Sequence, residues 1–128
     1  MEIFEEGESE TPSSSRRTQV DSLQGTLGAM VLKSLSRGPL HGYAIARWIE
    51  GIAGDQLLVE EGSLYPTLRR LEQRAWVTSR WAVSETGRKV KLYRLTTDGA
   101  RQLDAEVTRW RSFAAAVSRV LEEPGGAT

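Results

Sequence analysis

The sequence predicts a mainly α-helical fold with a small β-hairpin, arranged as a winged helix-turn-helix followed by a long C-terminal dimerisation helix. Three observations support this fold class. Several stretches have apolar residues at helical spacing, and two extended runs flank a turn that contains glycine. A last stretch then carries an apolar seam without a break. The 128 residues are enough for one compact domain but few for two.

The first half of the chain is predicted to contain three helices. The first covers about residues 23–36, and the second opens near residue 41 and ends at about residue 54. A short extended piece, residues 56–59, precedes a third helix at about residues 61–74. Pro66 fits this third helix only in its first turn, where the missing N–H costs little. The buried face of the second helix is expected to consist of Ala44, Ile45, Trp48, Ile49 and Ile52.

The second half begins with a predicted hairpin. Residues 76–83 and 89–95 are extended runs, and the turn between them contains Gly87. Residues 97–99, Thr-Asp-Gly, then offer an N-cap region for the last helix, which is expected to end before Pro124.

Composition excludes several function classes. The chain has no cysteine and a single histidine, His41, so we expect no disulfide and assign no metal site. A site made of carboxylates alone stays open, although no loop shows EF-hand spacing. We find no pairing of a nucleophile with a base and no phosphate-binding loop, and therefore predict neither enzymatic activity nor a cofactor. No stretch approaches the roughly 20 apolar residues of a membrane span. Because the first ten residues are acidic and unlike an export signal, we expect a cytoplasmic protein.

The charges are unevenly distributed along the chain. The formal net charge is zero, yet residues 1–22 carry six acids and two bases, a net charge of −4. Residues 62–101 carry nine bases and three acids, a net charge of +6. A basic zone of this kind favours binding to nucleic acid. A charged, solvated surface is the alternative interpretation.

The third helix is the predicted DNA-reading element. Leu64, Leu68 and Leu71 share one face and are expected to point into the core. The other side would present small polar, aromatic and basic groups to a major groove. These predicted DNA contacts are Ser63, Tyr65, Pro66, Thr67, Arg69 and Arg70. In the alternative, Tyr65 packs on the core and the arginines are only solvated.

The hairpin is predicted to add contacts to the DNA backbone. Arg88 and Lys89 lie at its tip, and strand alternation places Lys89, Lys91 and Tyr93 on one face. Basic groups in this position suit phosphates. The alternative is an edge that carries charges only to prevent aggregation.

The last helix carries the predicted dimer seam. Its apolar residues are separated by 4, 3, 4, 3 and 4 positions. A seam of this length is expected to pair with a second copy about a two-fold axis, or else to pack on the first helix of its own chain. Its members are Leu103, Val107, Trp110, Ala114, Val117 and Leu121. Trp110 would either fill the dimer core or line a cavity for a planar aromatic ligand.

Three runs at ordinary spacing resemble motifs of the PadR family of bacterial transcriptional repressors. They read GPLHGY at residues 38–43, EGSLYPTLRRLE at residues 61–72 and GRKVKLYRLTTDG at residues 87–99. The resemblance covers about residues 23–120 and is closest to the shorter members with a single C-terminal helix. It implies a homodimer on a pseudo-palindromic operator in double-stranded DNA, and release of that DNA when an effector binds.

The resemblance also implies roles for single residues. Tyr43, Ser63, Tyr65, Pro66 and Arg70 match family positions in or beside the DNA-reading surface, and Lys89 and Lys91 match the wing. Trp110 matches a tryptophan that stacks on flat, drug-like effectors in some members. Ala75 stands where the family usually has glycine, so the corner after the third helix is expected to be either strained or closed in a different way.

The predicted organisation is therefore a disordered acidic tail (residues 1–20), a DNA-binding domain (21–99), a dimerisation helix (100–123) and a disordered end (124–128). Two other functions stay open. One is a multidrug-type sensor with its ligand at the dimer interface. The other is an adaptor that uses the winged helix to bind proteins.

Overall fold

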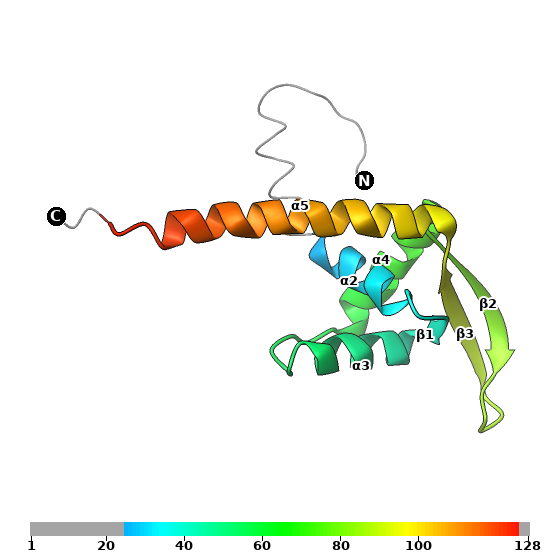
Figure 1. Ribbon diagram of the computed structural model, residues 1–128. Coiled ribbons are helices and arrows are strands. Elements are labelled where there is room, and N and C mark those ends of the chain that lie inside the picture. Colours follow the sequence, from blue (N-terminus) through cyan, green and yellow to red (C-terminus); the bar gives the residue numbers. More distant parts are fainter. Residues whose placement is uncertain (1–24, 126–128) are drawn as a thin grey trace. The chain divides into compact units, whose positions relative to one another are not determined.

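The computed structural model describes residues 25–125. The predicted tail (residues 1–20) and residues 126–128 of the predicted end lie outside this range. The predicted fold class is confirmed, because the described residues form four helices and a three-stranded antiparallel sheet of the winged-helix type (Figure 1). The elements are α2 (Thr26–Ser34), β1 (Leu40–His41), α3 (Gly42–Ile52), α4 (Glu61–Gln73), β2 (Val77–Val83), β3 (Lys89–Leu95) and α5 (Thr97–Leu121).

The chain divides into two compact units. One consists of Leu27–Val107 and holds the winged helix together with the first turns of α5. The part of α5 from Thr108 onward belongs to the other unit.

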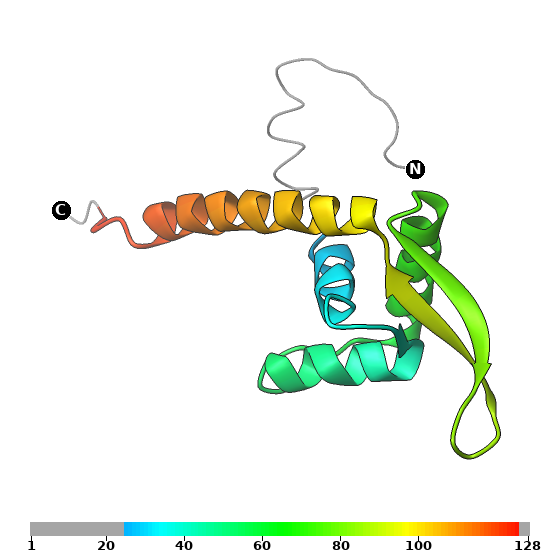
Figure 2. The ribbon, with the colours of Figure 1, turned by 45° about the vertical axis from the view of Figure 1, so that its right-hand side comes forward.

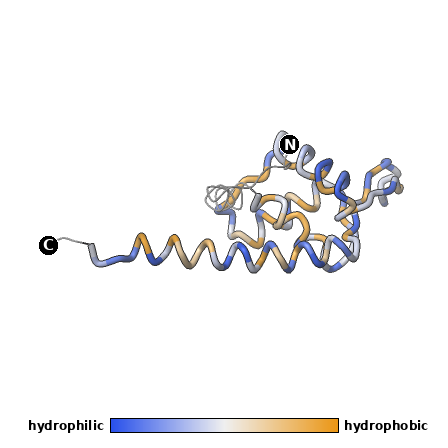
Figure 3. The backbone as a smooth tube through the Cα atoms, turned by 90° about the horizontal axis from the view of Figure 1, so that it is seen from above, coloured by the Kyte–Doolittle hydropathy of each residue, from blue (hydrophilic) through white to orange (hydrophobic). Residues whose placement is uncertain are grey.

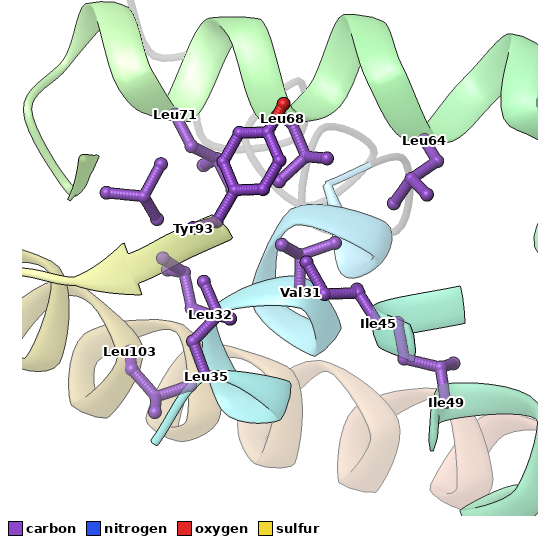
Figure 4. Close-up of a cluster of buried hydrophobic side chains, with 11 residues drawn as sticks. Val31, Leu32, Leu35, Ile45, Ile49, Leu64, Leu68, Leu71, Tyr93 and Leu103 are labelled. Atoms are coloured by element: carbon purple, nitrogen blue, oxygen red, sulfur yellow. The ribbon is translucent and has the colours of Figure 1, made fainter. Parts of the chain in front are cut away.

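The core of Leu27–Val107 is apolar and draws on every helix in this unit. Figure 4 shows α2, α3 and α4 contributing leucine, isoleucine and valine side chains to one cluster, with Tyr93 of β3 and Leu103 of α5 beside them. Each fully buried aliphatic side chain stabilises such a core by roughly 1.5–3 kcal/mol. The buried members are Val31, Leu32, Leu35, Ile45, Ile49, Leu64, Leu68, Leu71, Val77, Tyr93 and Leu103.

The third strand of the sheet, β1, was not predicted from the sequence. Residues 56–59 were expected to be extended, but they form no strand. Instead, β1 pairs with β3 in the register Leu40 with Tyr93 and His41 with Leu92. The sequence pattern does not reveal β1, because a strand of two residues shows no alternation and its partner lies far along the chain.

The start of α3 depends on His41. Its backbone is extended, and its Nδ1 accepts a hydrogen bond from the backbone N–H of Ala44 at 3.3 Å. Such a side-chain cap satisfies a donor that the first helical turn leaves without a partner. The predicted buried face of α3 holds for Ile45 and Ile49, but Ile52 is 70% exposed, so its assignment to that face was wrong.

The turn after α4 explains the expected strain at Ala75. The backbone N–H of Trp76 donates to the Leu71 carbonyl, and that of Ala75 donates to the Glu72 carbonyl. This pair of hydrogen bonds closes a helix with a residue in the left-handed region, which favours glycine. Ala75 occupies that position with φ 61°.

We therefore expect Ala75→Gly to raise the free energy of unfolding by about 1 kcal/mol, because glycine avoids the contact between Cβ and the carbonyl oxygen in this conformation. Urea denaturation followed by circular dichroism measures the change. As a control, Ala105→Gly in the exposed part of α5 is expected to lower the stability by roughly 1 kcal/mol. A loss of stability in Ala75→Gly would contradict the prediction.

The junction between the hairpin and α5 is held by Thr96. Its backbone N–H donates to the Trp76 carbonyl at 3.0 Å, and its hydroxyl Oγ1 donates to the Ala75 carbonyl at 2.7 Å. Oγ1 also accepts the backbone N–H of Gly99 at 2.9 Å. Thr96 therefore caps α5 and fixes it to the start of β2.

Candidate nucleic-acid interface

Helix α4 presents two different faces. Leu64, Leu68 and Leu71 point into the core, as the sequence predicted (Figure 4). The exposed residues on the rest of the helix include Ser63, Tyr65, Arg69 and Arg70, whereas Pro66 is partly buried. Because α4 begins at Glu61, Pro66 lies in its second turn, and the expectation of a first-turn position was wrong.

Thr67 is not on the outer face. The side chain is only 4% exposed, and its methyl group lies against Gly28 of α2. Its Oγ1 accepts a hydrogen bond from Nη2 of Arg70 at 3.1 Å. The predicted outward position of Thr67 was therefore wrong, because the apolar face of α4 is wide enough to include the residue beside Leu68.

Tyr65 packs against the beginning of α3. A Cβ atom added to Gly42 would lie 2.4 Å from the Tyr65 hydroxyl, so glycine is needed there for the ring to approach. Tyr65 is nevertheless 40% exposed. The packing interpretation therefore holds in part, since the ring joins α4 to α3 and still presents a surface to solvent, and DNA contact by Tyr65 stays a prediction.

Tyr43 extends the exposed surface onto α3. It is exposed and stacks on His41 with 6.5 Å between ring centroids. The guanidinium carbon of Arg47 lies 5.9 Å from the centroid of the Tyr43 ring. A hydroxyl and a cation therefore stand together at the start of the helix that precedes α4.

The hairpin, which we call the wing, is formed by β2 and β3. In both Figure 1 and Figure 2 it continues past β1 and the N-terminal end of α3. Arg88 and Lys89 are exposed at its tip, as predicted. Nζ of Lys91 lies 5.7 Å from the centroid of the Tyr93 ring, which agrees with the predicted common face of Lys89, Lys91 and Tyr93.

Tyr93 connects the wing to α4. Figure 4 shows its ring against α4, with Leu71 and Leu68 beside it. Burial raises the pKa of the Tyr93 phenol, and the charges of Glu72 and Tyr65 raise it further, whereas Arg69 lowers it. The buried ring thus fixes the wing against the helix that carries Arg69 and Arg70.

The resulting surface can bind a polyanion. Hydroxyls and cations of α4, of the start of α3 and of the wing are exposed in the same compact unit. Such donors suit phosphate oxygens and the edges of bases. Within residues 25–125, no group of three or more His, Cys, Asp or Glu side chains is placed to hold a metal ion. No helix in that range is long and apolar enough to cross a membrane.

The predicted dimer seam divides into two parts. Leu103 is 8% exposed and belongs to the core of Leu27–Val107, and Val107 packs against the same core. The assignment of Leu103 to a dimer contact is therefore corrected. Figure 3 shows apolar and polar residues alternating along α5. From Thr108 onward, the exposed large apolar residues are Trp110, Val117, Val120 and Leu121. Trp110 is 44% exposed, with the Phe113 ring centroid at 6.2 Å.

Sequence reasoning missed two residues of this region. Trp81 of β2 is exposed beside Lys89, and strand alternation would have placed the two on one face. Gly42 was quoted only as part of a motif, because the approach of Tyr65 is a tertiary contact that no local pattern reveals.

Comparison with known proteins gives a consistent result. The family model described as the transcriptional regulator PadR-like family matches residues 31–105. A PadR family transcriptional regulator from Eggerthella lenta is 31% identical, with 87% of this chain and 96% of that chain covered and a TM-score of 0.65. A PadR-like transcriptional regulator from Bacillus cereus is 26% identical, with 80% and 97% covered and a TM-score of 0.65.

Other similarities are more distant or partial. A transcriptional regulator from Clostridium thermocellum, 23% identical, shares the fold with a TM-score of 0.69 over 77% of this chain and 96% of that one. An uncharacterised protein of Lysinibacillus sphaericus is 24% identical over 102 residues, 80% of this chain and 94% of that protein. A transposon protein of Streptomyces fradiae is 40% identical over 93 residues, which span 73% of this chain but 24% of that protein.

Proposed function

Because the chain belongs to the PadR-like family of transcriptional regulators, we propose that it is a sequence-specific DNA-binding repressor that acts as a homodimer and is released by a small-molecule effector. Residues 21–99 form the DNA-binding domain in this proposal, and residues 100–123 form the dimerisation helix. The observation that carries it is the exposed set of hydroxyls and cations on α4 and the wing, which are held together by the packing of the buried Tyr93 ring against α4.

Each group has a proposed role on the DNA. Arg69 and Arg70 of α4 contact phosphates or guanine edges in the major groove, with Ser63, Tyr65 and Pro66 beside them. Tyr43 supports this contact from α3. Arg88, Lys89 and Lys91 of the wing pair with phosphates, which supply much of the affinity and its dependence on salt.

A dimer would place two such surfaces on one operator. Trp110, Ala114, Val117 and Leu121 follow one another at spacings of 4, 3 and 4 residues, and the large members are exposed in the single chain. Exposed apolar stripes of this kind usually mark an interface. A two-fold pairing of α5 then presents both α4 helices to a pseudo-palindromic site.

A salt titration with a charge-removal variant tests DNA binding. Operator duplexes are first selected from a random-sequence pool with the full-length protein. The logarithm of the binding constant is expected to fall linearly with the logarithm of salt concentration, by roughly 0.9 per phosphate neutralised. Arg70→Ala is expected to weaken binding to the selected duplex by about tenfold or more.

Arg101→Ala is the matched control, because Arg101 is an exposed arginine that pairs with Asp98 on α5 and is not among the proposed DNA contacts. It should bind as the unaltered protein does. Affinity that is weak at low salt and does not respond to ionic strength would reject DNA binding and favour the protein-interaction adaptor.

Trp110 supports a second function as a ligand sensor. Its accessible indole lies beside the Phe113 ring, an arrangement that suits a planar aromatic molecule. Planar cations should quench tryptophan emission, and Trp110→Ala should abolish this quenching with the dimer intact. Quenching of equal size in both proteins would assign it to Trp48, Trp76 or Trp81.

A further inference from the structure

The outer half of one wing face is both apolar and exposed. Trp81 is 62% exposed and Val83 is 71% exposed, and the two alternate on β2 with residues of the opposite face. Trp81 lies opposite Lys91, and Val83 lies opposite Lys89. Nζ of Lys89 is 5.9 Å from the centroid of the Trp81 ring. An apolar centre is thus bordered by two ammonium groups.

The same face continues into the packed part of the protein. Val77, Ser79 and Tyr93 occupy its inner half, where Val77 and Tyr93 are buried and the Ser79 hydroxyl donates to Oε2 of Glu72 on α4 at 2.5 Å. The free half that carries Trp81 is therefore an extension of the face that contacts α4. A ligand that binds along α4 and extends beyond it would therefore contact the outer half of the wing face, which carries Trp81.

The charge of the wing indicates what covers this face. Residues 77–95 contain five bases and one acid, so the hairpin has a net charge of +4. A protein surface of ordinary composition would lose the solvation of these cations without pairing them. Duplex DNA offers phosphates for the lysines and, between the phosphates, apolar faces of deoxyribose for the indole.

We propose that Trp81 is a DNA-contacting residue that packs on the sugar–phosphate backbone, while Lys89 and Lys91 pair with the adjoining phosphates. This inference rests on the proposed function and adds an apolar contact to it. The indole then contributes affinity that does not depend on counterion release, unlike the lysines.

The position of Trp81 along the wing favours the backbone over the bases. Glu85 at the tip lies four positions after Trp81, a span of roughly 13 Å in extended chain. The minor groove is only about 7.5 Å deep. Even if the tip reached the floor of that groove, Trp81 would stay at its rim, where the sugars and phosphates lie.

The test compares Trp81→Ala with the unaltered full-length protein on two duplexes of equal length, one selected from a random-sequence pool and one unrelated to it. Trp81→Ala is expected to weaken binding to both by about tenfold, because a large aromatic contact is lost from the interface. The slope of the logarithm of the binding constant against the logarithm of salt concentration should not change. Lys91→Ala should instead reduce that slope by about one.

Two further variants keep the result interpretable. Leu58→Ala removes another exposed apolar side chain, outside the wing, and should leave binding unchanged. Trp81→Phe keeps an aromatic ring, so it should retain most of the affinity. If Trp81→Ala does not fold, the change in tryptophan emission on adding DNA should still be smaller in Trp81→Phe than in the unaltered protein.

The outcomes are distinct. Equal binding of Trp81→Ala and the unaltered protein to both duplexes would overturn the inference, and so would a loss confined to the selected duplex, which would indicate a base contact. If the unaltered protein binds neither duplex in a salt-dependent manner, the proposed function itself fails.

Discussion

Replacing Gly99 by alanine is expected to lower the free energy of unfolding by at least about 3 kcal/mol, at the upper end of the cost of overpacking. An added Cβ would lie 2.0 Å from the Trp76 carbonyl oxygen and 2.8 Å from Cδ1 of Leu95. The side chain of Leu95 could move aside. The Trp76 carbonyl could not, because it accepts the Thr96 N–H at 3.0 Å and its position fixes the junction between β2 and α5.

Urea denaturation followed by far-ultraviolet circular dichroism measures the effect, with Gly51→Ala as the control. Gly51 lies within α3, and an added Cβ there would meet nothing within 4 Å. Alanine at that position should therefore stabilise the protein by about 0.5–1 kcal/mol. If the Gly99→Ala variant unfolded at the same urea concentration as the unaltered protein, α5 and the start of β2 would not approach each other as described.

Val117→Glu is expected to convert the protein into a monomer and to weaken operator binding by about 100-fold or more. Val117 lies in the middle of the exposed part of the seam, so in a dimer the carboxylate would be buried without a partner. A monomer binds its two half-sites independently and loses the advantage of effective concentration. Analytical ultracentrifugation should give twice the 14.2 kDa chain mass for the unaltered protein and that mass for the variant.

Ser118→Glu is the matched control, because it adds the same charge at the next residue, which is exposed and lies off the seam. It should remain dimeric. If the unaltered protein is monomeric at micromolar concentration, or if Val117→Glu remains a dimer, the pairing of α5 is rejected.

Much of the fold follows from local pattern. Leucines at helical spacing predicted both ends of α4 to within one residue of their positions in the structure. Alternation on either side of Gly87 predicted both strands of the wing equally closely. These signals suffice because each element buries one face against the same core. At Ala75 the family resemblance, and not local pattern, indicated a strained or differently closed corner, and its φ of 61° lies in the left-handed region that favours glycine.

The errors concern residues whose surroundings come from elsewhere in the chain. Thr67 lies at the border of the apolar face of α4, and its burial depends on the small Gly28 of α2 opposite it. Leu103 fits a coiled-coil seam by spacing, but the core of its own unit already covers it. The pairing of β1 with β3 depends on a partner about fifty residues away, and no sequence window contains both strands.

That distant pairing also bears on how the protein folds. Leu40 and Tyr93 are 53 residues apart, whereas the two strands of the wing are joined by a short turn. Contacts between distant residues slow folding, because the loop-closure entropy is lost before the contact is gained. The hairpin is therefore expected to form early and β1 to join it late, at about the time when α3 acquires the cap that His41 supplies. The folding transition state would then contain the wing and α4, with the first helical segments still incompletely docked.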